Sequence, residues 1–199
     1  EMAFAVKRDK TYTYQDYLTW PADERWEIIT GTAYDMSPAP RIKHQNITSN
    51  FHIKLKMHPD NSCYTGIAPT DVVFDEYNVV QPDVFLVCTA SKITEDNIQG
   101  SPDLIIEVIS EGTEVKDRRE RKNLYEKFGV KEYILVFPER EYLERYCLKK
   151  GEYGSPEIFD WDEILKLTVF EFEINLWEIF EKEKPEALAP LHTDLTGPQ

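Results

Sequence analysis

One carboxylate lies inside an apolar segment of the chain. Glu107 is preceded by Leu-Ile-Ile and followed by Val-Ile, within residues 102–109. On the two-residue period of a β-strand it shares a face with Ile105 and Ile109. A buried carboxylate without a partner is costly and tends to bind a proton. Glu107 therefore needs either a structural salt bridge or a metal cation, which would keep it ionised.

Two further acidic residues stand beside apolar runs. Asp83 follows a proline at the start of the run 84–88, and Glu27 is bracketed by Trp26 and Ile28. Taken alone, each fits a structural role, because aspartate after proline is common at strand starts and Glu27 can face outward from a hairpin. Neither residue by itself predicts a site.

The helix expected at 115–128 is basic in an otherwise acidic chain. Between residues 116 and 122, five basic residues against two acidic ones give a net charge of +3. Apolar residues share a helical stripe with Asp117 and Arg121, which turns Arg121 toward the protein. Lys122 lies about 100° away and either flanks the same site or points outward. A solvated charged face is the alternative, but the helix begins just beyond the strand that carries Glu107, where sites gather in open α/β sheets.

The hydrophobic pattern predicts an α/β, or α+β, fold with a mixed β-sheet flanked by helices. Strands are expected at 26–29, 32–36, 64–67, 71–74, 83–88, 102–109 and 132–137. Helices are expected at 14–19, 42–57, 115–128 and 176–180. The succession of strand, helix and strand over 102–137 suggests a βαβ crossover.

The C-terminal part of the chain predicts smaller features. Segments 142–148 and 153–159 are expected to form a peripheral β-hairpin. We expect one domain over residues 1–184 and a loose tail over 185–199, which holds few apolar residues.

Composition narrows the class of protein. The chain has 199 residues, of which 41% are hydrophobic and 30% charged, so a single globular domain is expected. No apolar stretch approaches the ~18 residues of a membrane span. Cys63, Cys88 and Cys147 are odd in number and form no CxxC pair, which indicates reduced thiols in a cytoplasmic protein rather than a zinc site.

The charge is strongly acidic and unevenly placed. The net charge is −14, and residues 151–199 hold 12 acidic and 3 basic residues, which is −9 of that total. Strong non-specific binding of nucleic acid depends on Lys and Arg that neutralise phosphates. The balance therefore predicts restricted binding of nucleic acid, if any.

Several segments together form an ordered set of motifs. Pro82-Asp83 precedes Glu107-Val108-Ile109 in the manner of a PD…E pattern. This pattern resembles the PD-(D/E)XK nuclease superfamily, and the whole set is similar to the bacterial Uma family of putative restriction endonucleases. The likeness runs from about residue 13 to residue 180. The matching segments are Trp26–Gly31, Met36–Pro40, His44-Gln45, Val80–Asp83, Ser101–Ser110 and Leu124–Tyr133.

The resemblance implies a restriction-endonuclease-like fold and a site that binds Mg²⁺ or Mn²⁺. It implies that the Asp83 and Glu107 carboxylates and the Val108 carbonyl hold the cation. Glu27 is expected to complete the coordination shell of that cation or to hold a second ion. Arg121 or Lys122 would stabilise charge on the phosphate. Further residues expected at the rim of the site are His44, Gln81 and Tyr125.

The chain departs from the family pattern at three positions. Ile109 stands where the superfamily has a catalytic lysine. The family lysine that resides on the following helix corresponds to Arg121, with Lys122 beside it, and an arginine cannot give up its proton. Thr32 replaces an acidic residue after the hairpin glycine. None of these three departures alters Asp83 or Glu107, the two carboxylates expected to bind the metal.

Three functions remain open on this basis. The first is a metal-dependent endonuclease that cleaves nucleic acid, with DNA the expected substrate. The second is a non-catalytic binding or assembly module on a degenerate nuclease fold, and the third is a hydrolase of a small phosphorylated substrate. A homodimer is expected, because cleavage of both strands favours two-fold symmetry and the hairpin offers Tyr142, Tyr146 and Tyr153.

Overall fold

A six-stranded mixed sheet forms the larger part of the computed structural model, which describes residues 6–7, 10–21, 23–36, 39–58, 62–110, 114–169 and 171–186. Its strand order is β12-β11-β10-β9-β7-β4. The strands are β4 (Tyr64–Ile67), β7 (Val84–Val87), β9 (Leu104–Val108), β10 (Glu132–Phe137), β11 (Tyr142–Cys147) and β12 (Glu157–Asp160). Strand β9 runs parallel to β10 and antiparallel to β7, and it is buried along its whole length.

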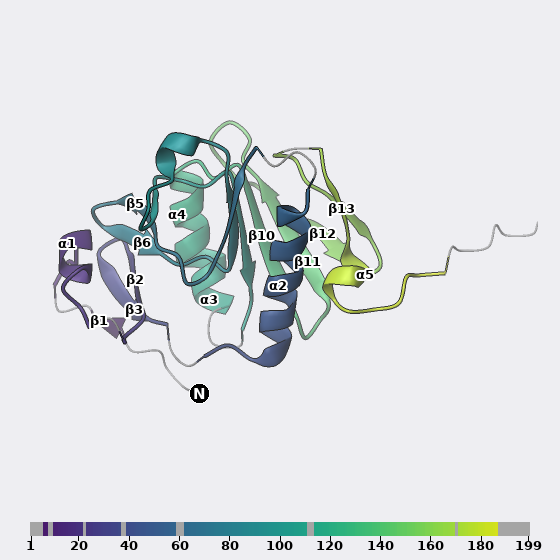
Figure 1. Cartoon of the computed structure of the whole chain (residues 1–199), viewed down its shortest axis with the longest axis horizontal. Coiled ribbons are helices and arrows are strands. Elements are labelled where there is room, and N and C mark those ends of the chain that lie inside the picture. Colours follow the sequence, from purple (N-terminus) through teal and green to yellow (C-terminus); the bar gives the residue numbers. More distant parts are fainter. Residues whose placement is uncertain are drawn as a thin grey trace, which may run out of the picture.

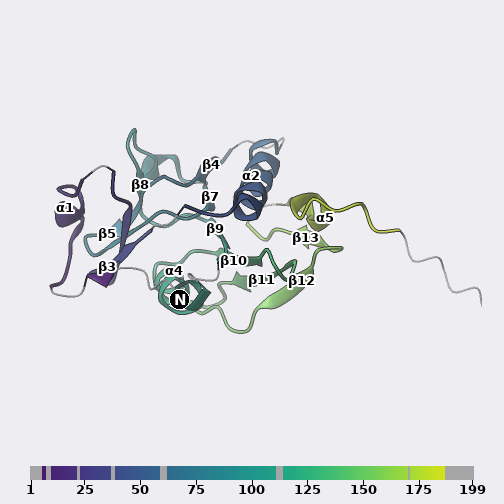
Figure 2. The same cartoon turned by 90° about the horizontal axis from the view of Figure 1, so that it is seen from below.

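Helices cover both faces of this sheet, as Figures 1 and 2 show. Helix α2 (Ile42–Lys56) lies on one face. The other face is covered by a continuous segment made of α3 (Glu114–Lys116), the π-helix η2 (Asp117–Arg121) and α4 (Lys122–Lys127). The sheet is therefore the middle layer of three, as expected for a doubly covered sheet.

Side chains along β9 alternate between the two helical layers. Leu104, Ile106 and Val108 pack in the cluster that includes α2, whereas Ile105 and Ile109 pack in the cluster that includes α4. Because successive side chains of a strand point to opposite faces, Glu107 lies on the face covered by η2 and α4.

A second sheet stands beside the first, at the left of Figure 1, with the order β1-β3-β2-β6-β5-β8. Its strands are β1 (Val6–Lys7), β2 (Trp26–Ile29), β3 (Thr32–Asp35), β5 (Val72–Asp75), β6 (Asn78–Val80) and β8 (Ile98–Gln99). Gly31 joins β2 to β3 with φ +72°, a conformation that L side chains rarely adopt. The smaller elements are α1 (Tyr14–Tyr17), η1 (Ala90–Lys92), β13 (Ile164–Lys166), β14 (Glu173–Asn175) and α5 (Leu176–Ile179).

The expected fold class, a mixed sheet flanked by helices, is confirmed. The peripheral hairpin exists as the antiparallel pair β11–β12 at one edge of the main sheet. The interface role expected for its aromatics is wrong in part, because Tyr146 and Tyr153 are buried in the core of this chain. Most of the tail expected at 185–199 lies outside the described residues.

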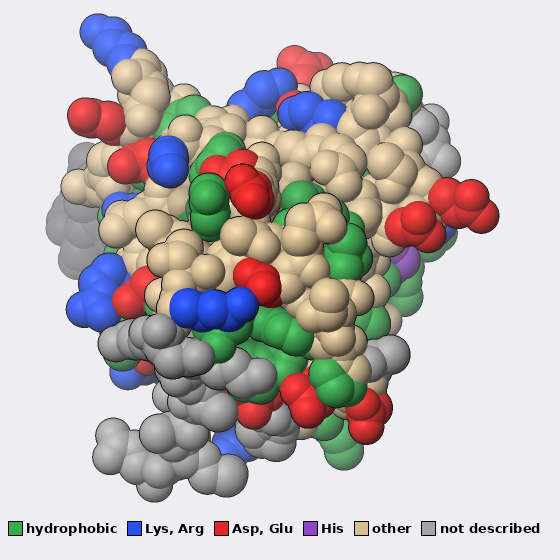
Figure 3. Space-filling view, turned by 90° about the vertical axis from the view of Figure 1, so that its left-hand side faces the viewer, with side chains coloured by type: hydrophobic (Ala, Val, Ile, Leu, Met, Phe, Trp, Pro, Cys, Tyr) green, Lys and Arg blue, Asp and Glu red, His purple; other side chains and the backbone are tan. Residues whose placement is uncertain are grey.

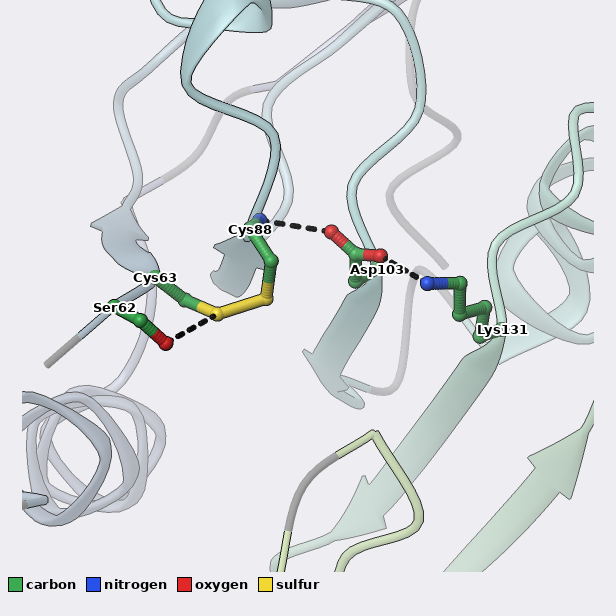
Figure 4. The surroundings of a disulfide bond; sticks show 5 residues. All are labelled: Ser62, Cys63, Cys88, Asp103 and Lys131. Atoms are coloured by element: carbon green, nitrogen blue, oxygen red, sulfur yellow. Dashed lines mark hydrogen bonds and ion pairs between the residues drawn. A yellow bond between two sulfur atoms is a disulfide. The ribbon is translucent and has the colours of Figure 1, made fainter. Parts of the chain in front are cut away.

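A disulfide joins Cys63 to Cys88, with their Cα atoms 4.1 Å apart (Figure 4). The expectation of reduced thiols is therefore wrong for these two residues, and only Cys147 of the three is free. The cause is the antiparallel pairing of β4 with β7, which extends to place the two cysteines opposite each other. The cytoplasmic assignment loses the support that it drew from reduced thiols. No helix in the described part of the chain is long and apolar enough to cross a membrane.

Candidate active site

Asp83 and Glu107 face each other across neighbouring strands. The register that pairs Val84 with Ile106 extends by one residue to place Asp83 opposite Glu107. The Asp83 backbone N–H donates to Glu107 Oε2 at 3.3 Å, and the Val108 N–H donates to Asp83 Oδ2 at 2.8 Å. Each carboxylate is therefore oriented by the main chain of the strand that carries the other.

Glu107 is almost fully buried, with 1% of its surface exposed. The Tyr125 hydroxyl donates to its Oε1 at 2.7 Å, and Arg121 Nη1 lies 2.8 Å from its Oε2. Burial raises the pKa of Glu107 well above its usual value, and neighbouring carboxylates act in the same direction while Arg121 opposes them. Burial therefore favours the protonated form of Glu107 unless a further cation offsets it.

Arg121 is the buried cation at the centre of the site. Its Nη1 contacts Asp117 Oδ1 at 2.9 Å as well as Glu107, and its Nη2 donates to Glu27 Oε1. Its Nε is buried and has no hydrogen-bond partner among the described residues. A guanidinium from η2 thus ties β9 of the main sheet to β2 of the second sheet.

Glu27 lies at 0% exposure on β2, not on the outer face of the hairpin. Besides Arg121, it accepts hydrogen bonds from Lys116 Nζ at 2.9 Å and from the Gln81 backbone N–H at 3.2 Å. Burial alone would raise its pKa, but the charges of Arg121 and Lys116 outweigh burial and lower the pKa to about 2. Both carboxylate oxygens are occupied, and Arg121 stands between Glu27 and Glu107.

His44 touches the acidic pair directly. It comes from the first turn of α2, and its Nε2 lies 3.3 Å from Asp83 Oδ2 while Nδ1 lies 3.4 Å from the Thr48 hydroxyl. Burial alone would lower the pKa of His44, but the hydrogen bond and charge of Asp83 together with a bond to the Val108 backbone raise it. His44, expected at the rim of the site, instead contacts the Asp83 carboxylate directly.

The other expected residues divide into those in the site and those outside it. Tyr125 is in contact with Glu107, as described above. The Lys122 ammonium lies 4.8 Å from the centre of the Tyr146 ring, so the structure does not bring Lys122 to the carboxylates. Of the two neighbouring cations, Arg121 is the one in the site.

Gln81 contributes its backbone rather than its side chain. Its amide group bonds to Arg25, Tyr17 and Asp71, which form a separate polar network beneath α1. Only its N–H reaches Glu27. Gln81 therefore helps to hold the Glu27 carboxylate through its backbone, without presenting its side chain to the site.

Lys116 and Asp117 were not expected as site residues. Asp117 is 1% exposed and pairs with Arg121, and Lys116 pairs with Glu27. The expected helix spacing already placed Asp117 on the same stripe as Arg121. No sequence signal marked Lys116, because the π-helix that follows it changes which residues share a face.

The described residues contain no group of three or more His, Cys, Asp and Glu side chains that could hold a metal ion. Asp83 contacts Glu107 through its backbone N–H and His44 through its carboxylate, but these three side chains do not form such a group. Glu27, expected as a further ligand, is not brought together with them. Any cation site here therefore depends on the Asp83–Glu107 pair and on backbone oxygen.

Comparisons with known proteins agree with this description. The model of the Uma2 family, described as putative restriction endonuclease, matches residues 14–177. The fold is similar to the crystal structure of a putative nuclease belonging to DUF820 from Anabaena variabilis, with a TM-score of 0.69 and 20% sequence identity. The match covers 85% of this chain and 97% of that chain, and at this identity it shows a shared fold. No curated protein matches the sequence.

Proposed function

The chain belongs to the Uma2 family of putative restriction endonucleases, and on that premise we propose that it hydrolyses phosphodiester bonds of nucleic acid at the Asp83–Glu107 pair. The observation that carries the proposal is the reciprocal bonding of these two carboxylates at the ends of β7 and β9. A fold alone does not establish an activity, so the weight rests on this site.

The residues present fit a divalent cation. The Asp83 and Glu107 carboxylates and the Val108 carbonyl are hard oxygen donors, which Mg²⁺ and Mn²⁺ prefer. The site holds four carboxyl groups, Glu27, Asp83, Glu107 and Asp117, against three basic groups, Arg121, Lys116 and the His44 imidazole, so acidic groups outnumber basic ones. The Asp83 side chain is 18% exposed, which leaves a route from solvent. Mg²⁺ or Mn²⁺ is therefore the proposed cofactor.

The chain's own groups have separate roles in the reaction. A cation bound at the pair supplies a water of lowered pKa and a Lewis acid for the phosphate. The Val108 N–H orients Asp83, and the Tyr125 hydroxyl orients Glu107. Arg121 remains charged at all relevant pH values and holds Glu27, Glu107 and Asp117 in place. Arg121 thus acts as a fixed positive charge behind the carboxylates.

The surface favours a restricted substrate. The net charge of −14 repels phosphates over most of the molecule. On the face shown in Figure 3, acidic and basic side chains are interspersed. Double-stranded DNA is the proposed substrate, and a homodimer is the proposed assembly because two copies of the site related by two-fold symmetry cut both strands.

A cleavage assay tests the proposal. Purified protein is incubated with supercoiled plasmid, linear duplex and single-stranded RNA in Mg²⁺, Mn²⁺ or EDTA. We expect metal-dependent cleavage of DNA by the wild type and none by Asp83→Asn or Glu107→Gln. Asp162→Asn and Glu139→Gln, which remove exposed carboxylates, serve as matched controls and should cleave like wild type. Equal cleavage by all five proteins would indicate a contaminating nuclease.

One observation favours the binding-module alternative. The Arg121 guanidinium already neutralises Glu107 and Glu27, so a stable fold does not require a metal ion. A binding module would hold nucleic acid or a partner protein without cleaving it and would show no Mn²⁺ affinity. Calorimetry of Mn²⁺ binding separates the two functions.

A further inference from the structure

The buried ion pairs of Arg121 leave it poorly placed to contact a substrate. Its two terminal nitrogens contact Asp117, Glu107 and Glu27, and its side chain is only 4% exposed. Its remaining donor, Nε, has no partner in the described part of the chain but is itself buried, so contact with a phosphate would require opening this buried network of ion pairs. Arg121, the cation at the family's lysine position, therefore stabilises the folded site rather than contacting the substrate.

Lys122 is also unsuited to the task. Its ammonium lies over the Tyr146 ring at 4.8 Å, and Tyr146 belongs to β11 of the main sheet. Lys122 would have to leave this ring to reach the carboxylates at the ends of β7 and β9.

Lys116 has the properties that the other two cations lack. Its ammonium lies 2.9 Å from Glu27 Oε2, and its remaining neighbours are weak partners: Met36 Sδ at 3.7 Å and the Tyr34 ring at 5.6 Å. Its side chain is 12% exposed, against 4% for Arg121. An ammonium has three donors, so Lys116 can keep Glu27 and still bind one more acceptor.

The π-helix explains why Lys116 reaches the site at all. In an α-helix, residues 116 and 121 would point about 140° apart. The i→i+5 bonding of η2 (Asp117–Arg121) brings residues five apart toward one side. Lys116 and Arg121 consequently contact the two oxygens of the same carboxylate, Glu27.

From these contacts we infer that Lys116 is the residue that donates to a non-bridging oxygen of the scissile phosphate. The inference rests on the proposed nuclease function and names one of its substrate-contacting groups. The ammonium stabilises the charge that develops on the phosphorane and exchanges no proton with it. Lys116 is linked to Glu107 of the acidic pair through two ion-pair partners, Glu27 and Arg121, which hold it in place.

The test compares three variants with the wild type. Lys116→Met removes the charge and keeps the apolar stem, Lys116→Arg keeps the charge, and Arg119→Met removes the same charge from an exposed position on η2. Cleavage of the DNA that the wild type cuts is measured at saturating substrate. Binding of the same duplex is measured in EDTA by fluorescence anisotropy over a range of salt concentrations.

We expect Lys116→Met to lower kcat by about a hundredfold. The slope of log Kd against log salt should fall by about 0.9, the value for one lost phosphate contact. Lys116→Arg should restore the slope, and Arg119→Met should match the wild type in kcat. A role limited to supporting Glu27 would lower the melting temperature of Lys116→Met and leave the slope unchanged.

The possible failures are distinguishable. If wild type cleaves no nucleic acid, the proposed function fails and this inference fails with it. If wild type cleaves and Lys116→Met keeps its kcat and salt slope, the function stands and Lys116 is not the contact. Loss of cleavage in a fourth variant, Lys122→Met, with cleavage retained in Lys116→Met, would assign the contact to Lys122 and overturn the inference.

Discussion

Arg121 Nη1 lies 2.8 Å from Glu107 Oε2 in a region from which both side chains are almost completely excluded from water. The same guanidinium also binds Glu27 and Asp117, so one cation compensates three buried carboxylates. Removing one partner of a buried ion pair leaves charge without compensation and costs about 3–5 kcal/mol. The stability of the fold and the geometry of the site therefore depend on the same residue.

We predict that Arg121→Met lowers the free energy of unfolding by about 3–5 kcal/mol. Arg121→Lys should cost less, because it keeps the charge and loses only the fork of donors. Urea denaturation measures both values. Arg119→Met, at a 71% exposed side chain, should change stability by no more than about 0.5 kcal/mol. A neutral effect of Arg121→Met would show that the three carboxylates do not need their cation.

The pH dependence of stability should report Glu27. Its folded-state pKa of about 2 is below the ordinary value of 4.5. A depressed carboxyl pKa contributes stability above the unfolded-state pKa, and this contribution is lost as pH falls from about 4.5 toward 2. Glu27→Gln should therefore cost about 3 kcal/mol at pH 7 and progressively less below pH 4.5.

Urea unfolding of wild type and Glu27→Gln at pH 7, 5, 4 and 3.5 measures this difference. Glu139→Gln, at an exposed turn residue, provides the control and should differ from wild type equally at each pH. A Glu27→Gln cost that stays constant over this range would show that Glu27 has an ordinary pKa.

The Cys63–Cys88 disulfide should stabilise the fold without affecting the site. It closes a sequence separation of 25 residues, for which chain entropy gives about 3 kcal/mol. Cys88 lies at the opposite end of β7 from Asp83. Dithiothreitol should lower the melting temperature of wild type by several degrees. The double variant Cys63→Ser/Cys88→Ser should melt at the same temperature as wild type treated with dithiothreitol, whether or not the reductant is present. It should keep the wild-type cleavage rate at 25 °C.

The periodic spacing of hydrophobic residues predicted the strands and helices that form the layers of this fold. The apolar run around Glu107 became β9, the run 132–137 became β10, and Ile47, Phe51 and Leu55 mark the buried side of α2. These predictions are confirmed because the burial of apolar side chains follows a local period of two residues in strands and of about 3.6 residues in helices. The position of Arg121 facing inward followed from the same rule.

Features that depend on pairing between distant segments were not predictable. Glu27 is buried because Arg121 and Lys116 reach it from a segment about ninety residues away along the chain. Cys63 meets Cys88 only because β4 pairs with β7. The contact of Lys116 with the site needs a π-helix, and single-residue propensities do not signal one.

Metal binding should stabilise the folded protein in proportion to occupancy. A ligand that binds only the folded state adds about 2.7 kcal/mol at a hundredfold excess over its Kd. We predict a rise in melting temperature with Mn²⁺ for wild type and for Glu27→Gln, because Glu27 is not placed with the acidic pair. Asp83→Asn and Glu107→Gln should show no rise. A response lost in Glu27→Gln would instead include Glu27 in the ligand set.

The most direct measurement joins metal binding to cleavage in one Mn²⁺ titration. Calorimetry gives the Kd of Mn²⁺, and the rate of plasmid cleavage is followed over the same concentrations in the same buffer. We predict that the rate rises with Mn²⁺ occupancy, and that Asp83→Asn abolishes both the heat of binding and the cleavage. Cleavage that persists in EDTA, or Mn²⁺ binding that Asp83→Asn leaves unchanged, would contradict a metal-dependent nuclease site at Asp83 and Glu107.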